Sequence, residues 1–424
     1  MSFQNTLSFA EQLDATDPLK SFRNKFIIPE ANGKQKIYFL GNSLGLQPKS
    51  TNGYLQQIMQ DWAALGVESF FHGKEPWINY HDILTHPLAK IVGALPHELV
   101  VMNQLTVNLH LMLVSFYRPT TQRYKIICEA RAFPSDQYAF ETHVKQQGFN
   151  PADAIIEVSP RPGEHCICNE DILSAIKENS ESTALVLFSG INYYTGQLFD
   201  MPAITKAAQA TGAKVGFDLA HAAGNVAMQL HDWDVDFACW CTYKYLNSGP
   251  GAIGGVFIHE KNHDKELPRF AGWWGYHKAT RFKMEQGFIP MPGAEGWQLS
   301  TPALFLYAAH RASLEIFEEA GWSNILAKQK LLNGYLWFLL EELNTKIPAG
   351  SIQFITPQNP AERGSQVSLL MLQKGREVFD ALTQEGIMVD WREPNVIRLA
   401  PVPLYNTFEE VWRFADTLQQ ILKR

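Results

Sequence analysis

The stretch Val215-Gly216-Phe217-Asp218-Leu219-Ala220-His221-Ala222-Ala223-Gly224 decides how this chain is expected to fold. It begins as a short apolar strand and ends in the carboxylate of Asp218, with His221 three residues later. In open α/β sheets, ligands lie beyond the carboxyl ends of the strands, so a charged side chain placed there faces a binding crevice. Taken alone, such an aspartate is more often the cap of a turn, and the functional interpretation therefore depends on its surroundings.

Short apolar runs and helical segments alternate on both sides of this stretch. Helices are predicted at residues 169–179 and 201–211, the second ended by Gly212. The predicted strands are residues 124–128, 154–158, 183–188, 215–217, 236–241 and 252–258. Alternation of strand and helix at this spacing predicts an α/β fold with a mainly parallel sheet that is covered by helices.

The pattern changes beyond Gly321. A helix is predicted at 302–319 before it, and after it a helix at 325–343, strands at 352–355, 367–372, 387–390 and 396–399, and a last helix at 407–422. We therefore expect three parts in the 424 residues. These are an N-terminal arm (1–49) that packs with the small domain, a large domain (50–320) and a small C-terminal α/β domain (321–424).

The composition excludes several classes of protein. There are 36 Lys and Arg against 43 Asp and Glu, a net charge of −7, so we expect neither nucleic acid nor a membrane as a partner. The 5 cysteines form no C-x-x-C pair, which argues against a disulfide framework and a zinc site, and we expect no metal. Without a signal-peptide pattern or a run of about 20 apolar residues, we expect a cytoplasmic protein.

A lysine follows the next predicted strand. Lys244, in Thr242-Tyr243-Lys244-Tyr245, precedes the glycine-rich turn at 248–251. Burial lowers the pKa of a lysine and makes it usable as a nucleophile towards an aldehyde. A lone lysine here could equally extend its amine to the surface. Paired with Asp218, however, it matches what pyridoxal phosphate needs: an amine for its aldehyde and an acid for its ring nitrogen.

Two segments could form the cup that the phosphate of this cofactor requires. Asn103-Gln104-Leu105-Thr106 precedes a helix-like segment at 107–114, and the N-terminus of a helix is a ready anion site. Phe133-Pro134-Ser135-Asp136 follows a strand and a turn, and it offers an aromatic face, a hydroxyl group and a second carboxylate.

The set Asp218, His221 and Lys244 resembles the class V branch of the fold-type I pyridoxal-phosphate enzymes. The chain resembles the kynureninases more closely, in seven ordered segments between residues 41 and 406. They are GNSLGLQP (41–48), NQLTVNLH (103–110), FPSD (133–136), FDLAHAAGN (217–225), HDWDVDFACWCTYKYLNSGPG (231–251), AGWWGY (271–276) and RLAPVPLYN (398–406). The resemblance implies a fold-type I transferase-like architecture, pyridoxal 5'-phosphate in the large domain, and a homodimer with shared active sites.

The resemblance also implies a role for each matching residue. Lys244 would bind the aldehyde of the cofactor covalently, Asp218 would pair with its pyridinium nitrogen, and Tyr243 would bond its phosphate and could donate a proton. The other expected cofactor contacts are Leu105, Thr106, Phe133, Ser135, Asp136, Ser189, His221, Trp273 and Thr301. Of these, Trp273 and Thr301, together with Ser300, would approach from the neighbouring subunit.

Four residues would bind the substrate: Arg398, Ser43, His72 and Ser300. Arg398 would hold the substrate carboxylate, a task for which a bidentate guanidinium is suited. The resemblance also implies that His72 and the pair Ser300-Thr301 adjust acceptance of a ring 3-hydroxyl group. The implied reaction is hydrolysis of L-kynurenine or 3-hydroxy-L-kynurenine to L-alanine and anthranilate or 3-hydroxyanthranilate, in tryptophan catabolism or NAD synthesis.

Two other functions are open at this point, and two more are set aside. One is a class V aminotransferase that acts on a small amino acid, and another is a pyridoxal-binding or structural dimer without activity. A nicotinamide-dependent oxidoreductase would need G-x-G-x-x-G between its first strand and helix, whereas residues 249–254 have that spacing ahead of a strand. A cysteine desulfurase is disfavoured, because Tyr243 replaces the usual histidine before the lysine and no cysteine follows Cys241.

Overall fold

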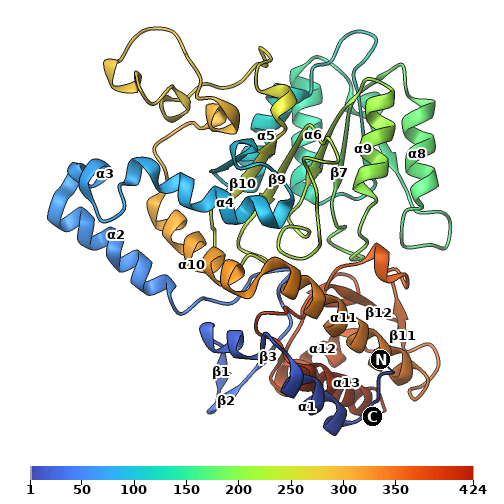
Figure 1. Ribbon diagram of the computed structural model, residues 1–424. Helices are drawn as coiled ribbons and strands as arrows, with labels where there is room; N and C mark the ends of the chain where they lie inside the picture. Colours follow the sequence, from blue (N-terminus) through green and yellow to red (C-terminus); the bar gives the residue numbers. More distant parts are fainter. Residues whose placement is uncertain (1, 424) are drawn as a thin grey trace.

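The computed structural model describes residues 2–423 and has a seven-stranded sheet at its centre (Figure 1). In spatial order the strands are β4 (Leu99–Met102), β10 (Gly254–Ile258), β9 (Phe237–Cys241), β8 (Lys214–Asp218), β7 (Thr183–Ser189), β5 (Lys125–Glu129) and β6 (Ile155–Val158). The strands from β9 to β6 run parallel, and only β10 is antiparallel to its two neighbours. The predicted α/β class and the mainly parallel sheet are confirmed.

Both faces of this sheet are buried, and side chains along each strand alternate between two hydrophobic cores. On β7, Leu185 and Leu187 belong to one core and Val186 and Phe188 to the other. The first core contains α5 (Leu105–Phe116) and α6 (Pro134–Gln146), and the second contains α8 (Asn169–Glu178) and α9 (Met201–Ala210). The continuous apolar runs of the sequence are therefore strands that are covered on both sides.

The C-terminal part has its own sheet and its own core. Its four strands are antiparallel, in the order β11 (Ile352–Phe354), β12 (Val367–Met371), β15 (Val396–Leu399) and β14 (Asp390–Arg392). Its helices are α11 (Trp322–Asn344), α12 (Gly375–Gln384) and α13 (Phe408–Leu422). The last strand and the last helix lie where the sequence predicted them, and the change at Gly321 coincides with the junction between α10 (Leu304–Ala320) and α11.

The strand predicted at 387–390 is divided between two sheets, which is a correction to the sequence analysis. Residues 387–388 form β13 (Ile387–Met388), which pairs in parallel with β3 (Ile37–Tyr38) of the N-terminal segment. Residues from Asp390 onward form β14 in the small sheet instead. The physical reason is that half of this run is paired by a segment about 350 residues away, a contact that local periodicity does not encode.

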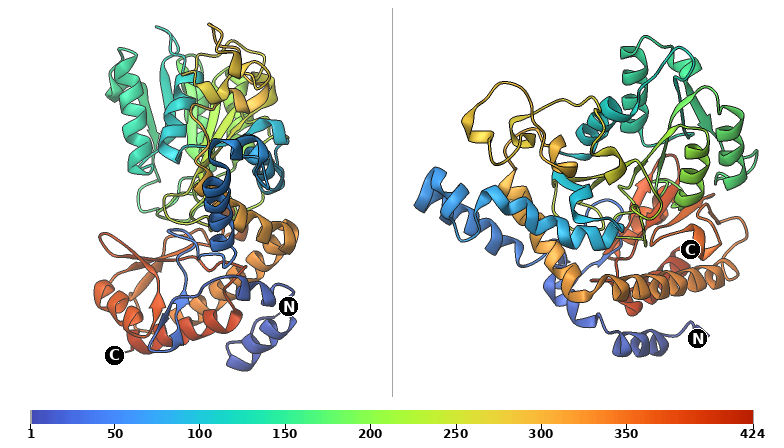
Figure 2. Two further views of the ribbon diagram at one scale, coloured as in Figure 1. Left: turned by 90° about the vertical axis from the view of Figure 1, so that its left-hand side faces the viewer. Right: turned by 45° about the horizontal axis from the view of Figure 1, so that its top comes forward.

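The N-terminal segment packs with the C-terminal part. Ala10 and Leu13 of α1 (Leu7–Thr16), together with Phe39, belong to the same core as α11 and α13. The carboxylate of Asp14 accepts hydrogen bonds from the backbone amides of Phe408 and Glu409 at the start of α13. Both views in Figure 2 place α1 beside the C-terminal elements. This packing supports the proposed division into an arm, a large domain and a small domain.

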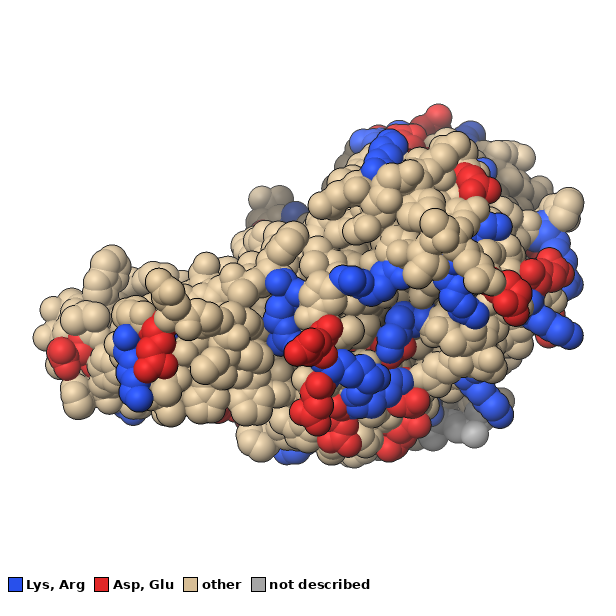
Figure 3. Space-filling view, turned by 90° about the horizontal axis from the view of Figure 1, so that it is seen from above, with Lys and Arg blue, Asp and Glu red and all other residues tan. Residues whose placement is uncertain are grey.

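A projection extends from the large sheet. It comprises α2 (Thr51–Leu65), α3 (Ser69–His72) and the irregular segment 270–303 that precedes α10. Seen from above, this end of the molecule is largely free of charged side chains (Figure 3). Helix α4 (Tyr80–Val92) connects it to β4. None of the helices described is both long and apolar enough to cross a membrane.

Candidate active site

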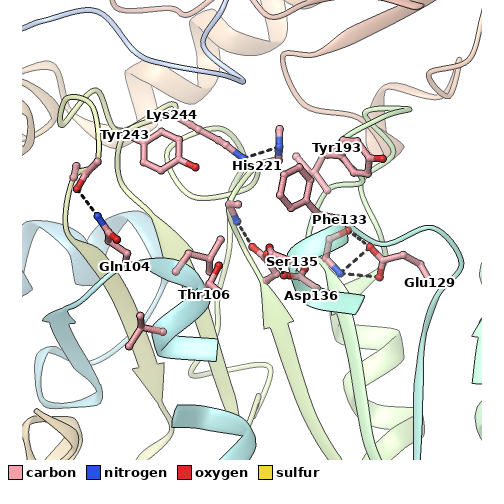
Figure 4. Close-up of a pocket in the computed structure, with 18 residues that line it drawn as sticks. Gln104, Thr106, Glu129, Phe133, Ser135, Asp136, Tyr193, His221, Tyr243 and Lys244 are labelled. Atoms are coloured by element: carbon pink, nitrogen blue, oxygen red, sulfur yellow. Dashed lines mark hydrogen bonds between the residues drawn. The ribbon is translucent and has the colours of Figure 1, made fainter. Parts of the chain in front are cut away.

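A cavity of about 430 Å³ lies at the carboxyl edge of the large sheet (Figure 4). Strands β5, β7 and β8 end there in Glu129, Ser189 and Asp218. The structure brings most of the predicted cofactor residues to this cavity: Leu105, Thr106, Phe133, Ser135, Asp136, Ser189, Asp218, His221, Tyr243 and Lys244 line it. This is the edge at which α/β sheets bind ligands.

The amine of Lys244 points at a neutral histidine. Its Nζ lies 2.9 Å from His221 Nε2 and 5.9 Å from the ring centroids of Phe133 and Tyr243. Burial lowers the pKa of His221 well below its ordinary value, and the nearby charge of Lys244 lowers it further. His221 therefore accepts a hydrogen bond from the ammonium group at Nε2. Its other ring nitrogen, Nδ1, is buried and has no hydrogen-bond partner within the described part of the chain.

Two carboxyl groups share one proton on the wall of the cavity. Asp218 ends β8 and Asp136 lies in the first turn of α6, and both side chains are buried. Burial raises the pKa of Asp136 well above its ordinary value, and the adjacent Asp218 raises it further. Burial also raises the pKa of Asp218, but the hydrogen bonds that it accepts from Asp136 and, at Oδ1, from the Ala220 amide at 2.7 Å lower it again, as does the charge of Lys244. We therefore place the proton of this pair on Asp136, which donates a hydrogen bond to Asp218. Asp218 is left as a buried anion, and no cation among residues 2–423 is in contact with it.

The N-terminus of α5 opens into the same cavity. Gln104 occupies the cap position, but its side chain makes no capping bond and instead donates from Nε2 to the carbonyl of Gly251 at 3.0 Å. The amide groups of the first turn, together with the hydroxyl of Thr106, are therefore free for a ligand. Unpaired amides and the helix dipole favour an anion such as a phosphate group.

Sequence reasoning missed some of the residues that line the cavity, among them Glu129 and Tyr193. Glu129 is the residue directly after the strand predicted at 124–128, so the argument used for Asp218 could have found it. Tyr193 lies in the loop after β7, and its ring packs edge to face on Phe133, with centroids 5.2 Å apart. No local signal indicated Tyr193, because its position depends on the path of a loop.

Arg398 and Ser43 adjoin the cavity but do not line it. The Arg398 side chain is buried, and its Nε lies 2.6 Å from Asp390 Oδ2. It also donates from Nη1 to the carbonyl of Tyr193, the residue that separates it from the cavity. Ser43 Oγ lies 3.5 Å from the other oxygen of Asp390. These side chains form one cluster behind Tyr193.

The remaining predicted residues lie on the projection, away from the cavity of their own chain. His72 is exposed at the end of α3, with Nε2 3.5 Å from a carboxylate oxygen of Glu68. Trp273, Ser300 and Thr301 are also exposed, and Trp273 packs edge to face on Phe282. Within a single chain, none of these four side chains reaches the cavity.

Comparison with known proteins identifies the family. A model of the family "Kynureninase C-terminal domain" matches residues 325–418. Kynureninase of Flavobacterium psychrophilum is 55% identical over 421 residues, 99% of each chain, and that of Koribacter versatilis is 52% identical over 417 residues, 98% of this chain and 97% of the relative. The chain belongs to the kynureninase family. Membership confirms the resemblance found in the short motifs.

Solved structures show how widely the kynureninase fold is shared. A cysteine desulfurase of Thermococcus onnurineus superposes with a TM-score of 0.75 over 92% of this chain and 95% of its own, at 18% identity. A K223A mutant of the protein C-DES, with glycine linked to its PLP cofactor, also has a TM-score of 0.75 at 18% identity, over 91% of this chain and 96% of its own. At this identity the likeness concerns the fold alone, and it confirms the expected fold-type I architecture.

Proposed function

We propose that this chain hydrolyses the Cβ–Cγ bond of L-kynurenine or 3-hydroxy-L-kynurenine with pyridoxal 5'-phosphate as its cofactor. The products are L-alanine and anthranilate or 3-hydroxyanthranilate. The observation that carries the proposal is the meeting of the Lys244 amine, the buried anion of Asp218 and the open N-terminus of α5 in one cavity. The kynureninases to which the chain is similar match it over nearly its whole length.

The residues present fit this cofactor. Asp218 is a buried anion that lacks a cation, His221 Nδ1 is buried without a partner, and the first turn of α5 lacks an acceptor. A protonated ring nitrogen, a polar ring substituent and a phosphate would supply these three partners. When bound, pyridoxal phosphate supplies an aldehyde for the amino group of the substrate and a ring that accepts electrons from the bonds around its α carbon.

The residues of the chain bind, orient and move protons. Lys244 Nζ would hold the aldehyde of the cofactor, and its amine, which hydrogen-bonds His221, would carry the α-proton of the substrate. The Phe133 ring is open to the cavity and can stack on the cofactor. Burial raises the pKa of Tyr243, so its hydroxyl keeps its proton and acts as a donor, which suits a contact with the phosphate.

Arg398 would bind the carboxylate of the substrate, with Ser43 beside it. The guanidinium is held by Asp390 and by the carbonyl of Tyr193, which keep its planar group fixed beside the cavity, behind Tyr193. A fixed guanidinium binds a carboxylate with two parallel hydrogen bonds and loses little side-chain entropy when it does so.

A second copy of the chain completes each site in this proposal. Exposed apolar side chains gather on the projection and at the start of α10: Met59, Trp62, Leu65, Val67, Phe71, Phe270, Trp273, Phe282, Met284, Ile289 and Phe305. Exposed apolar side chains that gather in one region often mark a protein–protein interface. We call this set the apolar patch. Burying it in a homodimer would carry His72, Trp273, Ser300 and Thr301 towards the cavity of the partner.

The cytoplasmic location is also part of the proposal, and the five free cysteines are consistent with a reducing compartment.

The reaction is tested by incubating the cofactor-loaded protein with each of the two kynurenines. We expect L-alanine and the corresponding aryl acid in equal amounts, measured by chromatography, and the ratio of the two rates gives the substrate preference. An oxo acid, with the amino group left on the cofactor, would instead identify an aminotransferase. Release of no aryl acid from either compound would disprove the proposal.

The Val67→Asp variant should weaken the dimer. Val67 is 71% exposed in the single chain, so a carboxylate there leaves the folded subunit intact but would be buried in the dimer interface. We expect the dissociation constant measured by sedimentation to rise by about tenfold or more. An equivalent substitution outside the patch, Leu372→Asp at a residue that is 48% exposed, serves as the control.

Mixed dimers test whether the sites are shared. Lys244→Ala and Trp273→Ala subunits should each be impaired when alone. In a shared-site dimer, a mixed pair has one site with both Lys244 and Trp273 intact. When equal amounts of the two variants exchange subunits without unfolding, about one quarter of all sites should carry both Lys244 and Trp273. No recovery of activity in the mixture would contradict sharing of the sites.

A further inference from the structure

Glu129 is a buried carboxyl group in the wall of the cavity, and it holds Ser189 in place. It ends β5 and lines the cavity (Figure 4), and it is 1% exposed. It is hydrogen-bonded to Ser189 at the end of β7. Its Oε1 accepts a hydrogen bond from Ser189 Oγ at 2.5 Å, and its Oε2 accepts one from the Ser189 amide at 3.0 Å. One carboxyl group therefore fixes both the backbone and the hydroxyl of Ser189.

The surroundings of Glu129 make its charge costly. Asp218 on β8 and Asp136 on α6 face it, and Cys128 precedes it on its own strand with Glu157 on β6 paired to that cysteine. Burial raises the pKa of Glu129 to about 7, against the Ser189 bonds that lower it. An uncharged side chain could hold Ser189 without the free-energy cost of burying a carboxylate. The presence of a carboxyl group here therefore indicates that gain and loss of its proton has a role.

We propose that Glu129 is a positioning residue of the active site, whose protonation decides whether the Ser189 hydroxyl donates or accepts a hydrogen bond in the cavity. When Glu129 is ionised, it accepts a hydrogen bond from the Ser189 hydroxyl, and the lone pairs of Ser189 Oγ are left to accept from a ligand. When Glu129 is protonated, it can donate to Ser189 Oγ, and the serine proton turns towards the cavity. The proposal rests on the proposed function, in which the cofactor lies against Ser189.

The Glu129→Gln variant separates this role from a merely structural one. Glutamine has the shape of the protonated acid and can donate to Ser189 at every pH. We expect kcat/KM to fall by about tenfold at pH 8, where wild-type Glu129 is mostly ionised, and by no more than about twofold at pH 6, where it is mostly protonated. A role in structure alone predicts a ratio of wild type to variant that does not change with pH, and that result would overturn the proposal.

A double-mutant cycle shows whether Glu129 acts through Ser189. If it does, Ser189→Ala removes the group that Glu129 controls, and adding Glu129→Gln should change kcat/KM at pH 8 by less than about twofold. Fully additive losses would mean that Glu129 acts on the reaction by another route. Glu157→Gln is the matched control, because Glu157 is an exposed carboxylate on the adjacent strand and does not line the cavity. Its pH profile should match that of the wild type.

An infrared titration of the cofactor-free chain gives a readout that does not depend on activity. With ¹³C at the glutamate carboxyl groups, we expect a protonated carboxyl band that shifts on labelling and disappears as the pH rises through about 7. The band should be absent in Glu129→Gln and present in Glu157→Gln. If no such glutamate band titrates near neutral pH, the proposal is wrong. If instead the wild type cleaves neither kynurenine, it is the proposed function that fails, and the infrared result still decides the protonation of Glu129.

Discussion

We expect the Lys244→Ala variant to cleave kynurenine at least about a thousandfold more slowly than the wild type. Among the residues that line the cavity, Lys244 carries the only amine, so no neighbour can replace it. Its Nζ makes one hydrogen bond, to His221, and the side chain is only half-buried. The substitution should therefore abolish the reaction but change stability little. We expect the melting temperature to stay within about a few degrees of the wild-type value, because only one hydrogen bond is lost.

Two controls make the result specific to this amine. Lys125→Ala removes a lysine from the amino end of β5, at the opposite edge of the same sheet, and should retain the wild-type rate. A small primary amine added to Lys244→Ala can enter the space left by the side chain and should restore part of the activity. If the variant keeps more than about a tenth of the wild-type rate, Lys244 is not the proton carrier.

The parts of the site that the sequence could predict are those set by strand ends. Asp218 and Lys244 each follow an apolar run, and parallel strands bring their carboxyl ends to one edge whatever the loops do. The same rule covers Glu129, which lies one residue beyond the run at 124–128. The rule of strand ends does not predict Tyr193, because its ring is placed by packing on Phe133 and not by the end of a strand.

Long-range pairing limits what local patterns can predict about the fold. The run at 387–390 was predicted as one strand because its apolar residues are continuous, yet the structure pairs Met388 with Tyr38 and Asp390 with Arg398. Each half is extended, as expected, but the choice of partner comes from the position of the N-terminal segment. The same holds for Trp273 and Thr301. Their proposed contacts are with the cavity of a second copy of the chain, and the pattern of one chain does not encode contacts between copies.

The variants Asp218→Asn and Asp136→Asn should differ sharply, although both replace a buried carboxyl group with an amide of the same shape. Asp218 is the ionised partner, so its amide cannot hold a proton on the ring nitrogen of the cofactor, and we expect kcat to fall by about 100- to 1000-fold. Asp136 carries the shared proton, and the amide of asparagine can donate to Asp218 in its place. We expect a loss of less than about tenfold for Asp136→Asn.

Melting temperatures of the cofactor-free variants test the same assignment by an independent route. Without the cofactor, Asp218 is a buried anion that lacks a cation, so its replacement by a neutral amide should raise the melting temperature at neutral pH. Replacing Asp136, which is already neutral, should change it little. Replacing Asp218 would then cost more activity than replacing Asp136, and it would also stabilise the cofactor-free protein more. This is expected of a buried charge that serves to bind a ligand. Equal kinetic losses and equal shifts in the two variants would mean that the proton is not localised on Asp136, and that either carboxylate can serve the ring nitrogen.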